Sequence, residues 1–332
     1  MLRHLADVKS LLWLVLTVLC VALQYLRPSW VVFLAPLSCY FALCCGVMAH
    51  NHNHCPTFRS RGLNRWFGNA LSIFYGYPTF AWIPTHNQNH HKFVNRPGDA
   101  TITWRYSEKH GIWVALTYFF VSSYWQSEPI KSFIARARRN NPRMYRDIVA
   151  QYVLWAGAHV GLCALAVLLH GWRQGLMLWG CACLIPALFA LWTIMLFNYE
   201  QHVHADPWSK HNHSRSWEGR WLNFLLFNNG LHAAHHEAPG THWSELWAVH
   251  RRIVPHIDSR LVERGGFMAY VFRQYVLAAF VPKLATVQVG RAPNDVPDGC
   301  SEDLASPPSE LGECGSNATM LGSRPRTASD LS

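Results

Sequence analysis

The sequence predicts an all-α integral membrane protein, with four transmembrane helices in two hairpins and a cytosolic helical cap that holds a histidine-rich dimetal site. Three observations lead to this prediction: long apolar runs, Lys and Arg concentrated between them, and 20 histidines that largely gather in four clusters. Apolar residues make up 50% of the 332 residues and charged residues 14%. A helix needs about 20 apolar residues to cross the hydrocarbon core of a bilayer, and runs of about that length favour a membrane protein.

The four apolar runs come in two pairs, each joined by a tight turn. The predicted spans are 11–26, 30–49, 148–169 and 176–199. Arg27-Pro28-Ser29 forms the first turn and residues 170–175 form the second. Two hairpins return the chain to the same side of the membrane each time. The predicted membrane domain therefore covers 1–287, with two long segments outside the bilayer.

The basic residues predict which side those long segments occupy. Segment 50–147 has 13 Lys and Arg and segment 200–332 has 12, whereas each tight turn has one. Because Lys and Arg accumulate on the cytoplasmic side of membranes, we expect both segments and both termini to be cytosolic. A bacterial inner membrane and the endoplasmic reticulum both fit. The net charge of +10 would also suit a nucleic-acid-binding protein, but the four spans argue against nucleic acid as a partner.

Three shorter apolar segments are interpreted as interfacial or buried helices: 71–83, 111–125 and 267–281. The second of them is too short to span and contains a Ser pair; as a span it would divide the histidines between the two sides of the membrane. From residue 288 the composition changes to Pro, Gly, Ser and acidic residues without aromatics. This composition predicts a disordered tail over 288–332.

Four histidine clusters have the spacing of a metal site. They read HNHNH at 50–54, HNQNHH at 86–91, NYEQH at 198–202 and HAAHH at 232–236. Helix positions i, i+3 and i+4 share one face. Three groups are therefore predicted to project together: His50 with His54, His86 with His90, and His232 with His235 and His236.

Adjacent histidines indicate two metal ions rather than one. His91 is turned from His90 by about 100° on a helix, so the two rings suit two ions side by side. Neutral imidazole binds iron, copper and zinc. One zinc ion takes at most four protein ligands, so this many histidines favour a dinuclear site. No Cys alternates with them, which disfavours an iron–sulfur cluster.

Several polar residues near the clusters have two possible roles each. His52, His204 and Cys55 are either further ligands or bystanders. His242 either lines a pocket or caps a turn. Ligating histidines usually donate their second ring N–H to a carboxylate or carbonyl. The candidate orienting carboxylates, which are otherwise ordinary surface charges, are Glu200, Asp206, Glu237 and Glu245.

The order of the clusters, interleaved with two hairpins, resembles the membrane fatty acid desaturase and hydroxylase superfamily of non-haem diiron enzymes. The pattern HxxxH, Hx(2–3)HH, NxxxH and HxxHH is most similar to its desaturase branch, and the resemblance covers about residues 10–260. It implies two iron ions and, as their ligands, His50, His54, His86, His90, His91, His202, His232, His235 and His236. It further implies Asn198 as a weak or water-mediated ligand.

The resemblance implies an oxidoreductase that uses O2 to oxidise a fatty-acyl lipid. We expect a fatty-acyl desaturase that introduces a C=C bond. The alternatives on the same scaffold are hydroxylation, terminal-alkene-forming decarboxylation, and carotenoid or hydrocarbon oxygenation. No catalytic residue beyond the metal ligands is predicted. Aromatic residues in 71–83 and 113–125 are candidates for lining a substrate channel or a packed core.

Electrons are expected from a separate ferredoxin or small haem protein, because the sequence has neither a His-Pro-Gly-Gly haem motif nor a Gly-rich dinucleotide fingerprint. Basic residues at 136–139 and 251–252 are candidates for docking an acidic carrier or for binding anionic membrane lipids. A metal transporter is the competing class. It would need polar or acidic residues inside the spans to form an ion path. The four runs contain no carboxylate, and Gln24, Gln151 and His159 are their few large polar side chains.

Overall fold

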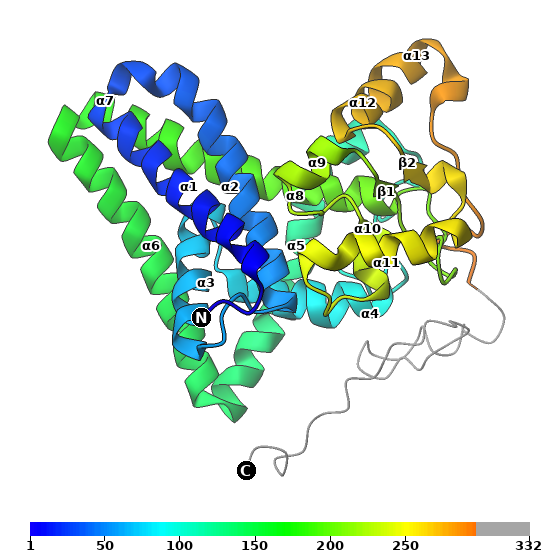
Figure 1. Ribbon diagram of the computed structural model, residues 1–332, viewed down its shortest axis with the longest axis horizontal. Helices are drawn as coiled ribbons and strands as arrows, with labels where there is room; N and C mark the ends of the chain where they lie inside the picture. Colours follow the sequence, from blue (N-terminus) through cyan, green and yellow to red (C-terminus); the bar gives the residue numbers. More distant parts are fainter. Residues whose placement is uncertain (297–332) are drawn as a thin grey trace.

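The computed structural model describes residues 1–296 and consists almost entirely of helices (Figure 1). Four helical stretches are long and apolar enough to cross a membrane: Leu5–Leu26, Pro28–His54, Pro142–His170 and Trp172–His202. They contain α1 (Val8–Leu26), α2 (Val31–His54), α6 (Pro142–His170), α7 (Trp172–Trp179), η5 (Gly180–Leu184) and α8 (Ile185–His202). Each of the four predicted spans lies inside one of these stretches, which indicates an integral, multi-pass membrane protein.

The two hairpin turns differ from each other. Between α1 and α2 the chain passes through the short η2 (Pro28–Trp30), with Pro at a first helical position where its missing N–H costs nothing. The second turn is shorter than the predicted 170–175, because only Gly171 separates α6 from α7. Gly171 has φ +75, a conformation that favours glycine. Gly175 then lies so close to Val167 that a Cβ would be 2.5 Å from its backbone.

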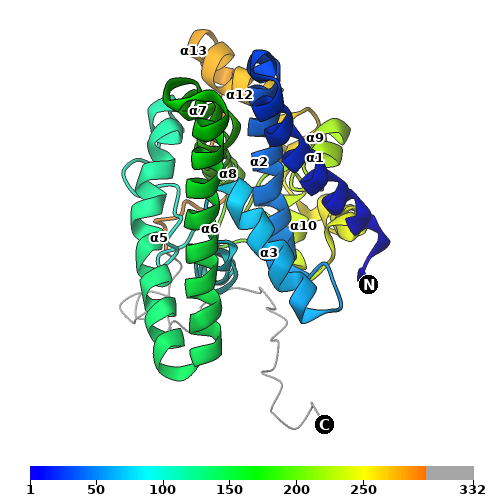
Figure 2. The same ribbon diagram turned by 90° about the vertical axis from the view of Figure 1, so that its left-hand side faces the viewer.

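Helices α2 and α8 pack together and lead into the histidine clusters at their C-terminal ends. Gly46 permits the close approach, because a Cβ there would lie 2.7 Å from the Tyr75 ring and 3.3 Å from Ile194. The buried Cys44 and Cys45 act as small apolar side chains in this core. By contrast, α6 has few buried side chains and is the span most exposed around its circumference. Figure 2 shows α6 beside α5 at the outside of the bundle.

The segment between α2 and α5 is more broken than predicted. Helix α3 (Arg61–Tyr75) ends at Gly76, which has φ +91 and lies against Ala187. The interpretation of 71–83 as one helix is therefore wrong, since the left-handed Gly76 terminates α3 inside it. The chain continues as η3 (Thr79–Ala81), the π-helix η4 (Ile83–His90) and α4 (His91–Phe93).

The other two apolar segments are helical. The predicted 111–125 belongs to α5 (Ile112–Asn140), which is much longer than expected and continues through Pro129. The predicted 267–281 forms α12 (Phe267–Phe272), η9 (Arg273–Leu277) and α13 (Ala278–Phe280).

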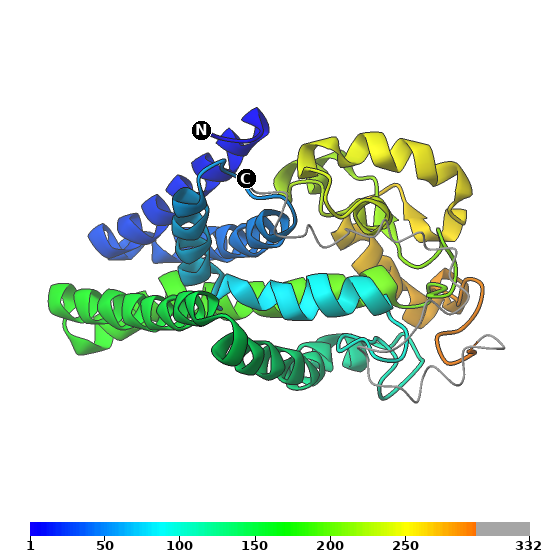
Figure 3. The same cartoon turned by 90° about the horizontal axis from the view of Figure 1, so that it is seen from below.

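The cap contains α9 (Arg220–Leu225), α10 (His232–Glu237), α11 (Leu246–Ile253) and a small parallel pair, β1 (Ser216–Trp217) and β2 (Val262–Glu263). Short 3-10 turns join these elements: η6 (Trp243–Glu245), η7 (Val254–His256), η8 (Ser259–Leu261) and η10 (Pro282–Leu284). Figure 3 shows the cap on one side of the molecule and the long helices on the other. The histidine-bearing ends of α2 and α8 meet the cap, so the fold brings the four clusters together.

Both ends of the described chain contact the cap. At the N-terminus, η1 (Leu5–Asp7) brings the buried Asp7 to His242 Nε2, at 3.1 Å, and Trp243 Nε1, at 3.0 Å. The His242 ring also accepts from the Ser244 N–H, so the turn-capping interpretation of His242 is confirmed. At the other end, Val289 is buried and donates its N–H to His204 O. Residues 288–296, which we assigned to the tail, thus remain in contact with the domain; the rest of the predicted tail, 297–332, lies outside the described residues.

Candidate metal centre

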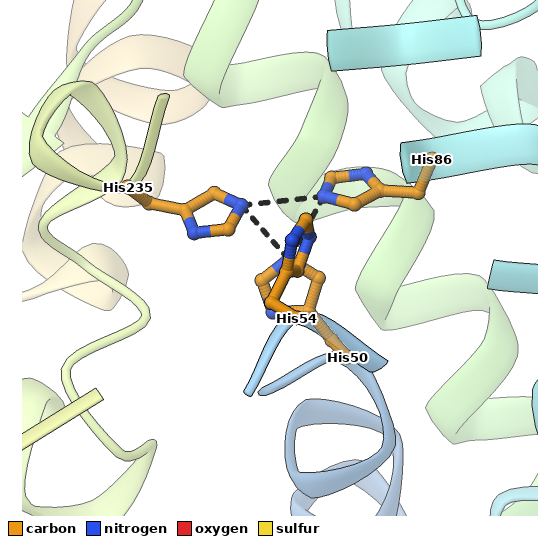
Figure 4. A group of neighbouring side chains, drawn as sticks. All are labelled: His50, His54, His86 and His235. Atoms are coloured by element: carbon orange, nitrogen blue, oxygen red, sulfur yellow. Dashed lines mark hydrogen bonds between the residues drawn. The ribbon is translucent and has the colours of Figure 1, made fainter. Parts of the chain in front are cut away.

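The predicted ligands form two groups of four converging imidazoles. In each group the candidate ligand nitrogens all lie within 4.8 Å of one another. Cluster A is His50, His54, His86 and His235, and cluster B is His90, His202, His232 and His236. Figure 4 shows cluster A, with His50 and His54 on one helix end and His86 and His235 reaching in from two other elements. Segments far apart in sequence therefore supply each group.

His91 completes cluster A. Its Nε2 lies 3.0 Å from His86 Nε2 and 2.9 Å from His235 Nε2. The structure thus brings all nine predicted histidines into two adjacent clusters, five in cluster A and four in cluster B. The adjacent pair His90 and His91 is divided between the clusters, as the turn of a helix predicts.

Two of the predicted pairings are wrong, and helix geometry explains both. His86 shares cluster A with His91 rather than pairing with His90; the chain here is π-helical, with wider turns than an α-helix and hydrogen bonds from i to i+5. His235 faces cluster A, whereas His232 and His236 contact each other in cluster B with Nε2 atoms 3.1 Å apart. The short α10 therefore lies between the two clusters and supplies both.

The imidazole nitrogens fit a cation better than they fit one another. Nε2 of His50, His86 and His235 form a triangle with sides of 2.9, 3.1 and 3.3 Å. A neutral imidazole has one N–H and one acceptor nitrogen, so three mutually facing nitrogens cannot all be paired by hydrogen bonds. In addition, Nε2 of His54 and of His90 is buried without any partner within residues 1–296. Each cluster thus presents unpaired nitrogen lone pairs toward its centre.

Burial keeps these rings in the form that binds metal. For His86, His91, His232, His235 and His236, burial and then the neighbouring imidazoles hold the pKa well below its usual value. Protonated rings would repel one another and lose solvation. These five rings are therefore neutral near pH 7, and neutral imidazole is the ligating form.

An unpredicted carboxylate orients cluster B. His90 Nδ1 donates to Asp99 Oδ2 at 2.8 Å, and Asp99 also accepts from the backbone N–H groups of Asn95 and Thr101. Burial alone would raise the pKa of Asp99, but His90 and these hydrogen bonds lower it to about 2. With Nδ1 donating, the lone pair of His90 Nε2 points into the cluster. The sequence held a signal for Asp99: it is the one acidic residue between positions 8 and 107.

The second anchor in cluster B is a backbone carbonyl. His202 Nδ1 donates to His213 O at 3.0 Å. A carbonyl acceptor leaves no trace in a sequence, because every residue has one. The His213 ring itself lies beside His236, with ring centroids 5.2 Å apart.

The four predicted orienting carboxylates do not contact the clusters. Glu200 lies two residues before His202, about 200° around the helix, and accepts from His110 at 2.8 Å and from Tyr270 at 2.9 Å. Asp206 accepts from the Trp208 N–H, and Glu245 lies 3.5 Å from His4. Within residues 1–296, none of these three nor Glu237 is hydrogen-bonded to a cluster imidazole.

The additional candidate ligands also lie outside both clusters. His52 Nδ1 contacts Thr57, His204 Nδ1 contacts Thr286, and Cys55 Sγ lies 3.9 Å from His4. Asn198 is different, because it borders a cavity together with cluster residues. Its Nδ2 donates to the Tyr118 hydroxyl at 2.8 Å, which holds the amide next to cluster B without making it part of the cluster.

A cavity of about 560 Å³ runs along the clusters. Rings of both clusters form part of its wall, and the remainder is largely apolar. Its aromatic lining includes Tyr75, Tyr77, Trp82 and Phe119. Four of the aromatics in 71–83 and 113–125 thus line this cavity, and Tyr75 also belongs to the adjoining apolar core. The volume is typical of a small-molecule site.

One comparison with known proteins identifies the family. The family model described as fatty acid desaturase matches residues 28–265, a range that includes both clusters. No curated protein and no solved structure matches the chain. The match covers more than half of the sequence, and the two histidine clusters are those of a dimetal site typical of the family. The chain is thus an oxidoreductase that belongs to the fatty acid desaturase family.

Proposed function

We propose that the protein is an O2-dependent fatty-acyl desaturase that introduces a C=C bond into a lipid acyl chain at a diiron centre. The observation that carries this proposal is the largely apolar cavity whose wall includes rings of both histidine clusters. Family membership implies a fatty-acyl substrate. A long, unbranched chain fits a cavity of this kind better than a compact polar metabolite does.

The residues that would hold the two iron ions follow from the two clusters. Cluster A, with His91, would bind one ion through five imidazoles. Cluster B would bind the other through four, with Asn198 close enough to the cavity to act through water. When bound, such an ion pair supplies O2 activation and the removal of hydrogen from an unactivated C–H bond.

The shape of the cavity would position the chain. Helix α5 contributes one face to the wall, at spacings of three and four residues: Phe119, Ser123, Gln126, Ser127, Ile130, Lys131 and Ile134. This face is about 22 Å long at 1.5 Å per residue. An acyl chain lying along it would present one methylene to the clusters while the apolar wall excludes water. Such placement matters, because an error of about 1 Å can lower a rate on the order of 100-fold.

Electrons would come from a separate ferredoxin or small haem protein. Exposed arginines near the end of α5 and on α11, at 136–139 and 251–252, support docking of an acidic carrier. The same charges favour a cytosolic orientation of the clusters and of both termini. Anionic membrane lipid is the alternative partner for these arginines.

Hydroxylation, decarboxylation to a terminal alkene, and oxygenation of carotenoids or hydrocarbons remain the alternatives on this scaffold. Gas chromatography–mass spectrometry of lipids from cells that express the protein and a competent electron donor separates them. We expect monounsaturated acyl chains that disappear with His235→Ala. Hydroxy acids or terminal alkenes would be consistent with the diiron site but would overturn desaturation as the reaction. An unchanged lipid profile would contradict a fatty-acyl substrate.

A further inference from the structure

Lys131 is the one Lys or Arg among the described residues that line the cavity, and no Asp or Glu lines it. The cavity therefore carries a single permanent charge, and that charge is positive. An uncharged substrate would leave Lys131 without a function in this wall, whereas an acyl chain with an anionic head would complement it.

The neighbours of Lys131 place it at the edge of the membrane-embedded part of the molecule. Helix α5 packs here on the first turns of α6, where Phe133 and Ile148 share one apolar core with Tyr152 at its edge. Ile148 is the residue at which the apolar run of α6 begins. Tyr152 also lines the cavity. A bilayer has its polar head groups at this level, just outside the start of an apolar span.

No side chain within residues 1–296 competes for Lys131. Its ammonium group has no hydrogen bond or ion pair there, although Glu128 is one turn earlier on α5. Glu128 instead accepts from the Ser132 hydroxyl at 3.0 Å. Lys131 is exposed at the cavity rim and is free to bind an anionic oxygen.

We propose that Lys131 binds the anionic head of the acyl substrate, a carboxylate or a phosphate, and so fixes how far the chain enters the cavity. This inference rests on the proposed function, because it assumes an acyl substrate. Lys131 is a positioning residue: the distance between the bound head and the clusters selects the carbon that is oxidised. From Lys131 the acyl chain would run along the wall past Ser127 and Gln126 toward Phe119.

Binding without turnover tests the charge. A dansyl-labelled undecanoic acid and its methyl ester are titrated into the purified full-length protein in detergent, and fluorescence gives the Kd. We expect Lys131→Met to weaken binding of the acid about fivefold, as for a solvent-accessible ion pair, and to leave binding of the ester unchanged. Lys131→Arg, which keeps the positive charge, should bind the acid with the wild-type Kd.

Arg143→Met is the matched control, because Arg143 is exposed at the start of α6 and does not line the cavity. It removes the same charge from the first turn of α6, the helix that packs against α5. The proposal is wrong if Arg143→Met weakens binding of the acid as much as Lys131→Met does. It is also wrong if Lys131→Met weakens binding of the acid and of the ester alike. Equal acid binding by the wild type and Lys131→Met would also overturn it.

Product positions then test the depth of the chain and identify the source of the anion. Free fatty acid, acyl-CoA and anionic phospholipid are supplied separately to the wild type and to Lys131→Met. The substrate that uses Lys131 should show a raised KM and a mixture of double-bond positions in the variant, with little change in kcat. A wild type that oxidises none of them contradicts the proposed function, whereas a variant with unchanged positions for every oxidised substrate contradicts the role of Lys131 alone.

Discussion

Two rings of cluster B are held by acceptors outside the site, whereas the rings of cluster A mainly contact one another. His90 donates to the buried Asp99 and His202 to the carbonyl of His213. In cluster A, only His50 has an Nδ1 hydrogen bond within residues 1–296, and its partner is the adjacent Asn51. Cluster A is instead positioned by its elements: the end of α2, the π-helix η4 and α10.

This difference teaches that one centre can be built by two methods. A hydrogen bond to a carboxylate or to a backbone carbonyl fixes a ring independently of helix packing. Where those bonds are missing, the rings depend on how closely the helices approach. Cluster B should therefore be sensitive to the loss of its acceptors, and cluster A to changes in helix packing.

The largest effect is expected from removing a ring of cluster A. His235→Ala takes away the imidazole that contacts His50, His86 and His91. We expect product formation to fall by more than about 100-fold, because a lost ligand exceeds the effect of a lost orienting group. Iron analysis should show one ion lost from cluster A, and retention of both ions with full activity would contradict the assignment.

The next largest effect concerns the anchor of cluster B. Asp99→Asn keeps the size of the side chain but removes the charge that holds His90 Nδ1–H. A loss of about 10–100-fold in metal affinity or activity is expected, measured by iron titration and by turnover. Glu245→Gln is the control, since within residues 1–296 the Glu245 carboxylate is paired with His4 and with no cluster imidazole. Equal losses of metal affinity and turnover in the two variants would show that Asp99 does not orient His90.

Metal removal should loosen the contacts between the elements that supply the clusters. When the free iron concentration is about 1,000 times the Kd, binding adds about 4 kcal/mol to the free energy of unfolding. Chelation should thus lower the Tm and expose the segment between α3 and α5 to proteases. A Tm that does not change on chelation would mean that the clusters bind no ion in the purified protein.

A packing change at Gly46 should affect cluster A more than cluster B. Gly46→Val inserts atoms where a Cβ already lies 2.7 Å from the Tyr75 ring, and α2 carries two histidines of cluster A but none of cluster B. Overpacking of this kind costs about 1–3 kcal/mol of stability. We expect weaker iron binding at one of two sites; Gly62→Ala on α3, where the nearest atom is 3.7 Å away, is the control. Weakening of both sites together would argue against independent support of the clusters.

The smallest effect is expected at His52. His52 lies on α2 between His50 and His54 but faces Thr57 and Phe67 instead of the cluster. His52→Asn should retain both iron ions and change turnover less than about twofold, as is usual for substitutions away from a site. Loss of an ion from this variant would return His52 to the list of ligands.

Much of this arrangement follows from patterns that a sequence displays directly. Apolar runs predicted the four spans, and i, i+4 spacing predicted that His50 and His54 act together. The division of His90 from His91 followed from the 100° turn between neighbours. These features are local, so they need no knowledge of the tertiary structure.

The features that could not be predicted depend on packing across long separations or on backbone detail. The π-helical turn that unites His86 with His91 has no sequence signature. Glu200 was predicted to orient a ligand because it is close to His202 in sequence, but it points to the opposite side of α8. The carbonyl of His213 and the cavity wall formed by α5 appear only when distant segments are assembled.

The most direct test of the diiron account is the metal content of the purified protein, measured by inductively coupled plasma mass spectrometry together with Mössbauer spectroscopy after growth in ⁵⁷Fe. We expect two iron ions per chain in the wild type, one of them lost in His235→Ala and the other weakened in Asp99→Asn. A single ion per chain, or two zinc ions in an active protein, would contradict a diiron centre built from clusters A and B.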